Sequence, residues 1–104
     1  MGKRVAITAR DLFFRAKLQA IVQSAGGVVT ASGEDCDLAL VELGGDAERR
    51  IGEHIARGVP VLAFGSHVQP DMLRDARALG ARVVPNSQVE RTLRELLPAV
   101  LGSE

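Results

Sequence analysis

The middle of the sequence reads Asp37-Leu38-Ala39-Leu40-Val41-Glu42-Leu43-Gly44-Gly45. It is a short apolar run with a carboxylate near each end, followed by two glycines and a polar helical pattern. A run of this length, bounded by turn signals and flanked by helices, is typical of a strand buried on both faces of a parallel sheet. Because ligands of such sheets bind at the carboxyl ends of the strands, Glu42 is expected at the rim of a site. The alternative is a solvated acid at the end of a strand.

Length and composition predict one globular domain over residues 1–104. The chain has 46% hydrophobic and 25% charged residues, which is ordinary globular usage. Its 13 basic residues balance 13 acidic residues, so the net charge attracts neither nucleic acid nor an anionic membrane. Three phenylalanines and no Trp or Tyr provide little for stacking on bases. We therefore expect no nucleic-acid partner.

A single cysteine, Cys36, leaves no internal disulfide to form and suits a reducing compartment. After Met1, only a few apolar or small residues occur before polar residues return, so neither a signal-peptide core nor a membrane span is predicted. We expect a cytoplasmic protein with no membrane partner.

Strands and helices alternate along the chain. We predict strands at residues 4–8, 28–30, 37–43, 59–64 and 82–84, and helices over 11–25, 46–57, 70–79 and 87–100. Ser87 and Glu90 fit a capping box at the start of the last helix, and Pro98 is expected to kink or end that helix. The alternation predicts an α/β fold with a parallel sheet covered on both faces.

With these elements in place, the chain resembles the receiver domain of bacterial response regulators over nearly its whole length. Residues 37–43 look like the third receiver strand, which ends in the phosphate-accepting aspartate. Residues 60–66 look like the fourth strand, and residues 72–81 are similar to the fourth helix and the Gly-Ala turn after it. The resemblance implies a flavodoxin-like, doubly wound, five-stranded parallel sheet in the order 2-1-3-4-5 and a role in signal transduction.

The site residues of receivers are altered in this chain. Receivers hold magnesium with an acidic pair after the first strand, and the matching positions are Ala9 and Arg10, with Asp11 one residue later. Magnesium requires hard oxygen ligands, and an arginine repels it. The accepting aspartate is matched by Glu42, whose side chain is one methylene longer.

Further positions of the receiver site differ as well. The hydroxyl residue at the end of the fourth strand is replaced by Gly65, with Ser66 beside it, and the lysine after the fifth strand has no counterpart near Pro85. Most elements of phosphoryl transfer are thus missing. We predict a stand-alone, degenerate receiver with no catalytic residue, metal or cofactor, which acts by protein–protein interaction with an unidentified partner.

Glu42 leaves several hypotheses open. It could pair with Arg10 and imitate the charges of a phosphorylated receiver, or Arg10 could simply point into water. A second hypothesis is a phosphoacceptor with an adapted site. A third is a small-ligand site at this rim, formed with Asp11, Ser66 and His67. A metal site is not expected, because the two histidines lack companions at metal-ligand spacing.

Phe13 and Phe14 are adjacent on the first predicted helix, roughly 100° apart around its axis. Both cannot point to the middle of one apolar face, so we expect one at the edge or in solvent. An exposed Phe beside Arg15 would anchor a partner protein. The alternative is that a loop covers the start of the helix and both rings are buried.

A second resemblance is to the BRCT domain, an interaction module of DNA-damage proteins. Residues 21–29 look like its first helix and Gly-Gly turn, and residues 58–62 look like the approach to its last strand. That family has a tryptophan in its final helix and no fifth strand, whereas this chain lacks tryptophan and has a fifth strand pattern.

The connection between the second and third predicted strands has about six residues, too few for the helix that a parallel crossover normally includes. The helix between strands 2 and 3 is therefore predicted to be missing, and part of the sheet should lack cover. We expect a patch formed by Val28, Thr30, Ile51 and Ile55 to be exposed, and to be covered by a second copy of the chain in a two-fold homodimer.

Overall fold

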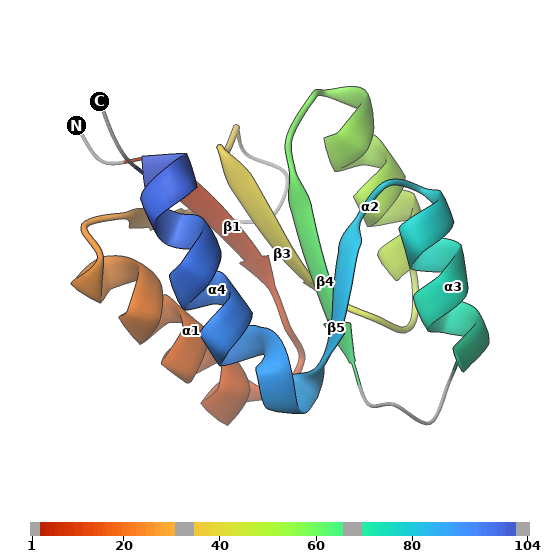
Figure 1. The fold of residues 1–104 in the computed structure, drawn as a ribbon, viewed down its shortest axis with the longest axis horizontal. Coiled ribbons are helices and arrows are strands. Elements are labelled where there is room, and N and C mark those ends of the chain that lie inside the picture. Colours follow the sequence, from red (N-terminus) through yellow and green to blue (C-terminus); the bar gives the residue numbers. More distant parts are fainter. Residues whose placement is uncertain (1–2, 31–34, 66–69, 102–104) are drawn as a thin grey trace.

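The computed structural model describes residues 3–30, 35–65 and 70–101, which form one parallel sheet and four helices (Figure 1). The strands are β1 (Arg4–Thr8), β2 (Val28–Thr30), β3 (Leu38–Glu42), β4 (Val61–Gly65) and β5 (Arg82–Pro85). The helices are α1 (Leu12–Ser24), α2 (Ala47–Ala56), α3 (Pro70–Ala78) and α4 (Asn86–Leu101). All pairings are parallel and the order is β2-β1-β3-β4-β5, which confirms the predicted topology.

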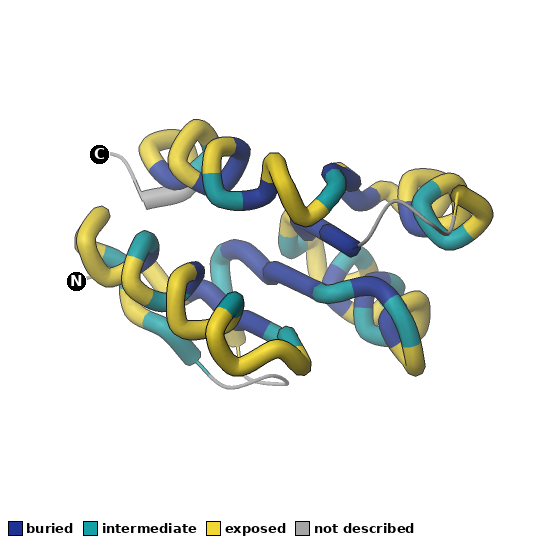
Figure 2. The backbone as a smooth tube through the Cα atoms, turned by 90° about the horizontal axis from the view of Figure 1, so that it is seen from below, coloured by how far each residue is buried: buried dark blue, intermediate teal, exposed yellow. Residues whose placement is uncertain are grey.

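The sheet lies between two layers of helices, with α1 and α4 on one face and α2 and α3 on the other (Figures 1 and 2). Successive residues of β3 alternate between these two cores. Leu38 and Leu40 pack under α1 and α4, whereas Ala39 and Val41 pack under α2 and α3, and all four are buried. The central run is thus a strand buried on both faces, as the sequence predicts.

Several element ends differ from the sequence prediction, chiefly those of β4 and α4. Strand β4 runs from Val61 to Gly65, so it starts later and ends later than expected. Helix α4 begins at Asn86, directly after β5, and Ser87 therefore lies inside the first turn and not before it. Pro98 does not end α4, which continues to Leu101. The carbonyl that Pro98 leaves without a donor is that of Arg94, an exposed residue where water can satisfy it.

The chain passes from β2 to β3 with no helix among the described residues of the connection, as predicted. Cys36, near the end of this connection, packs against the core under α2 and α3, with its thiol beside the backbone of Ala6 and Leu38. Ala6, in the middle of β1, is buried. The connection itself therefore replaces part of the missing helical cover.

Of the four residues of the exposed patch predicted across this face, one is exposed, two are half-buried and one is buried. Ile51 is fully buried, and Ile55 is half-buried against the core under α2 and α3. The reason is the placement of α2, which packs over β3 and β4 and turns its apolar stripe toward the sheet. Val28 remains 48% exposed, and Thr30 is half-buried.

Candidate functional site

The carboxyl edge of the sheet brings Arg10, after β1, next to Glu42, the last residue of β3. The backbone N–H of Arg10 donates to Glu42 Oε1 at 2.6 Å, and Arg10 Nε lies 4.0 Å from the same oxygen. The Glu42 side chain is only 18% exposed. The structure thus places the predicted partners side by side, and Arg10 does not simply extend into water.

Arg10 is also bound to the connection that follows β3. Its Nη2 donates to the carbonyl of Leu43 at 2.8 Å, and its guanidinium group lies over Gly44. Gly44 has φ +118°, which L side chains rarely adopt, and a Cβ atom there would overlap Arg10 Nη2. Sequence reasoning missed this role of Gly44, although the glycine pair directly after Glu42 was visible.

Asp11 is the N-cap of α1 and does not serve as a free carboxylate of the rim. Its Oδ1 accepts from the backbone N–H groups of Phe13 at 3.0 Å and Phe14 at 3.1 Å. These two bonds satisfy donors that the first turn of a helix leaves without partners.

Gly65 is the buried last residue of β4, and it faces Leu43. A Cβ atom at Gly65 would lie 3.2 Å from Cβ of Leu43, so a larger residue requires Leu43 to shift. Ser66 and His67, the other predicted rim residues, lie outside the described residues.

The two phenylalanines of α1 separate as predicted. Phe14 packs edge-to-face on Phe64, with ring centroids 5.3 Å apart, whereas Phe13 is 86% exposed. Leu12, the first residue of α1, is 72% exposed beside Phe13. Arg15, two residues after Phe13, is also exposed. Two large apolar side chains therefore reach solvent directly after Arg10 and Asp11.

Two further reactive side chains among the described residues are His54, on α2, and Cys36, in the connection before β3. His54 is buried, and its burial together with Arg57 lowers its pKa. Burial also raises the pKa of the Cys36 thiol, which disfavours the nucleophilic thiolate. Within residues 3–30, 35–65 and 70–101, no cluster of metal-ligating side chains occurs. No helix in those ranges is long and apolar enough to cross a membrane.

Comparison with known proteins gives matches by structure alone. No family model matches the sequence. No curated protein matches it either. The signal receiver domain of a modulated diguanylate cyclase from Desulfovibrio desulfuricans G20 superposes with a TM-score of 0.79 at 17% identity, over 96% of this chain and 94% of that one.

Two further solved structures are similar over almost their whole length. A CheY-like receiver domain protein from Methanospirillum hungatei JF-1 has a TM-score of 0.76 at 16% identity, over 95% of this chain and 96% of that one. A response regulator from Thermotoga maritima has a TM-score of 0.74 at 15% identity, over 99% and 100% of the two chains. The chain has the fold of a receiver domain. The fifth strand of this receiver-like chain also removes the BRCT interpretation.

Proposed function

We propose that this receiver-like chain is a cytoplasmic signalling module that acts by protein–protein interaction, without phosphorylation and without enzymatic activity. The observation that carries the proposal is the contact of Arg10 with Glu42. The carboxylate at the position that the receiver resemblance assigns to the phosphoacceptor already has a hydrogen bond from Arg10 N and a guanidinium group 4.0 Å away.

The charge of Arg10 argues against the metal that phosphoryl transfer needs. Receiver chemistry relies on magnesium to neutralise the charge that develops on the phosphoryl group. Here a positive side chain stands where the resemblance implies a magnesium ligand, and it is held there by Leu43 O and Gly44. Such a cation repels Mg²⁺ and supplies an internal counter-ion for Glu42.

The partner surface that we propose is the exposed start of α1. Leu12 and Phe13 are exposed large apolar residues, and Arg15 lies beside them. A rigid aromatic ring flanked by an arginine is typical of binding hot spots. Because Arg10 is two residues before Leu12, a protein bound to the start of α1 would also contact the Arg10 guanidinium group.

Incubation with acetyl phosphate and magnesium, followed by intact-mass measurement, tests the absence of phosphorylation. We expect no phosphate adduct on this chain, while a phosphorylatable receiver treated in parallel gains one. An adduct that forms on the wild type and is lost in Glu42→Gln would overturn the proposal in favour of an adapted phosphoacceptor.

Partner capture tests the interaction itself. Glu42→Gln removes the negative charge beside the Arg10 guanidinium group, and Phe13→Ala removes the exposed ring. We expect both variants to lose a partner that immobilised wild-type chain retains, while Arg77→Gln, on the distant helix α3, retains it. Unchanged capture and an unchanged amide spectrum in Glu42→Gln would contradict a role for this carboxylate.

We also propose that the chain forms a homodimer through β2. This strand is an edge of the sheet, and its first residue, Val28, is exposed. An unpaired edge with an exposed apolar residue favours association with another strand. Light scattering over a concentration series is expected to show a dimer that Val28→Lys dissociates. A monomer at every concentration would rule out the homodimer and leave the partner surface on α1 unaffected.

A further inference from the structure

A second candidate site lies between α1 and α4, and Glu42 is not among the residues that line it. The two helices lie side by side on the same face of the sheet (Figures 1 and 2). Between them is an open groove of about 750 Å³. This volume is within the range of small-ligand sites, which is about 300–1,000 Å³. Five of the nine lining residues are apolar: Ala20 and Ile21 from α1, Ala25 at its C-cap, and Leu97 and Pro98 from α4.

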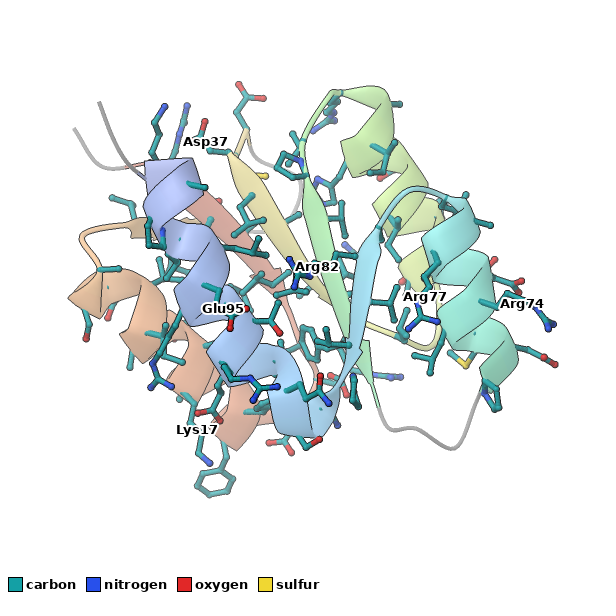
Figure 3. All side chains as sticks on the ribbon, in the orientation of Figure 1. Lys17, Asp37, Arg74, Arg77, Arg82 and Glu95 are labelled. Atoms are coloured by element: carbon teal, nitrogen blue, oxygen red, sulfur yellow. The ribbon has the colours of Figure 1, made fainter. Side chains whose placement is uncertain are left out.

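Three charged residues also line the groove. Lys17 comes from α1, which Figure 3 shows next to α4, and Glu90 and Arg94 come from α4. In the part of the chain that the structure describes, none of the three forms an ion pair. Two positive charges from opposite walls and one negative charge leave the groove with a net charge of about +1 at neutral pH.

The charges gather toward one end of the groove. Both helices follow strands of the same parallel sheet on the same face, so they run in the same direction. Lys17 and Glu90 therefore lie at one end, Arg94 lies one turn further along, and Ala25 and Pro98 lie eight residues beyond Lys17 and Glu90 respectively. Eight helical residues span about 12 Å. The groove thus changes from charged to apolar along its length, and this length as a whole suits an extended amphipathic chain whose charged group lies at the charged end.

We propose that this groove binds an amphipathic monoanion with a flexible aliphatic body, such as a medium-chain carboxylate. The anionic group lies between Lys17 and Arg94, and the aliphatic body lies along Ile21, Leu97 and Pro98. The single negative charge follows from the net charge of the groove, because Glu90 opposes a second one. This site goes beyond the partner surface proposed at the start of α1 and does not depend on it.

Sodium decanoate is a suitable probe, followed by amide chemical shifts of the isotope-labelled chain. We expect saturable shifts concentrated in residues 17–25 and 90–98. Octanoate, two methylenes shorter, should bind about fifteenfold more weakly, because each buried methylene changes affinity by roughly fourfold. Shifts scattered over the whole chain, or equal affinity for the two carboxylates, would overturn the proposal.

Charge variants give the sharpest test, because the proposal predicts that some of them weaken decanoate binding and one strengthens it. Lys17→Gln and Arg94→Gln should each weaken decanoate binding by about two- to fivefold, and Glu90→Gln should strengthen it by a similar factor. Arg77→Gln on α3 is the matched control and should leave the affinity unchanged (Figure 3). Non-specific association with apolar surface would give no such reversal of sign. If the charge variants show no reversal, the proposed site is wrong.

A steric pair of variants completes the experiment. Ala20→Phe fills the groove from an exposed position of α1, whereas Ala16→Phe, also exposed on α1, is outside the lining. We expect the first variant to abolish decanoate binding and the second to retain it. If the wild type is a dimer that Ala20→Phe dissociates, the groove holds a second copy of the chain and the ligand proposal is wrong.

Discussion

The guanidinium group of Arg10 occupies the space that a Cβ atom on Gly44 would need. This contact connects the end of β1 to the turn after β3, and the Arg10–Leu43 hydrogen bond of 2.8 Å reinforces it. In addition, the backbone N–H of Arg10 donates a hydrogen bond to the side chain of Glu42, the last residue of β3. The position of Arg10 over the edge of the sheet therefore depends on the absence of a side chain at residue 44.

Gly44→Ala should destabilise the chain by about 1–3 kcal/mol, because it combines an unfavourable φ with overlap of Arg10. Urea unfolding would measure the change. The double variant Arg10→Ala/Gly44→Ala should recover the steric part of the loss and keep the backbone part. Gly52→Ala is the matched control: Gly52 lies inside α2 with open space around it, so alanine there should stabilise by roughly 0.5–1 kcal/mol. A loss in Gly44→Ala no larger than in other surface variants would contradict the role of this glycine.

The sequence predicts the sheet well because its signals are local. An apolar run such as residues 38–42, followed by two glycines, specifies a buried strand and a turn without reference to other elements. The order of strands follows from the family resemblance and agrees with the structure. The contact of Arg10 with Glu42 could be anticipated because the two residues lie at the carboxyl ends of neighbouring parallel strands, β1 and β3.

Other features depend on where a helix lies over the sheet, which periodicity does not give. Ile51 was expected in an exposed patch because no helix follows β2 to cover that part of the sheet, whereas α2 packs over β3 and β4 and buries this residue. The groove between α1 and α4 depends on facing side chains about 70 residues apart, such as Lys17 and Glu90. Leu12 fits the helical apolar stripe, yet it lies beyond the edge of the sheet and is exposed.

Truncation of Phe14 should destabilise the fold, whereas truncation of Phe13 should have little effect. Phe14→Ala removes the edge-to-face contact with Phe64 and should destabilise by about 2–3 kcal/mol, below the usual loss for a fully buried ring because Phe14 is half-buried. Phe13→Ala should change the free energy of unfolding by less than about 0.5 kcal/mol, since the ring is exposed. Denaturant unfolding of the two variants measures both values. Equal losses would show that the start of α1 is covered, and would remove Phe13 as a partner anchor.

His54 should make the stability of the fold fall in mildly acidic solution. Its pKa in the folded chain is lowered, first by burial and then by the charge of Arg57, whereas the unfolded chain titrates near an ordinary value of about 6.5. As the pH falls through about 6.5, the unfolded state takes up more protons than the folded state, so the free energy of unfolding decreases. The contribution is complete above about pH 7.5.

Urea unfolding between about pH 8 and pH 5 would measure this dependence in a range where most carboxylates stay ionised. His54→Leu has a side chain of similar size and no titrating group, and it also removes a buried Nδ1 atom that lacks a hydrogen-bond partner. We expect this variant to lose most of the decrease toward pH 5. A wild-type stability that rises as the pH falls from 7 to 5 would mean that His54 is protonated in the folded chain.

Arg10 should be the residue that keeps magnesium away from Glu42. Replacing Ala9 and Arg10 together by aspartate removes the cation and places two carboxylates beside a third, which gives the hard oxygen ligands that Mg²⁺ prefers. Thermal unfolding with excess magnesium chloride should then show a metal-dependent stabilisation in the double variant and none in the wild type, because a ligand bound only by the folded state raises its stability. The double variant Ala9→Asp/Arg15→Asp is the matched control: it carries the same net charge but leaves the Arg10–Glu42 contact in place. Equal stabilisation in both double variants would show that magnesium responds to overall charge, and Arg10 would then not be the group that excludes it.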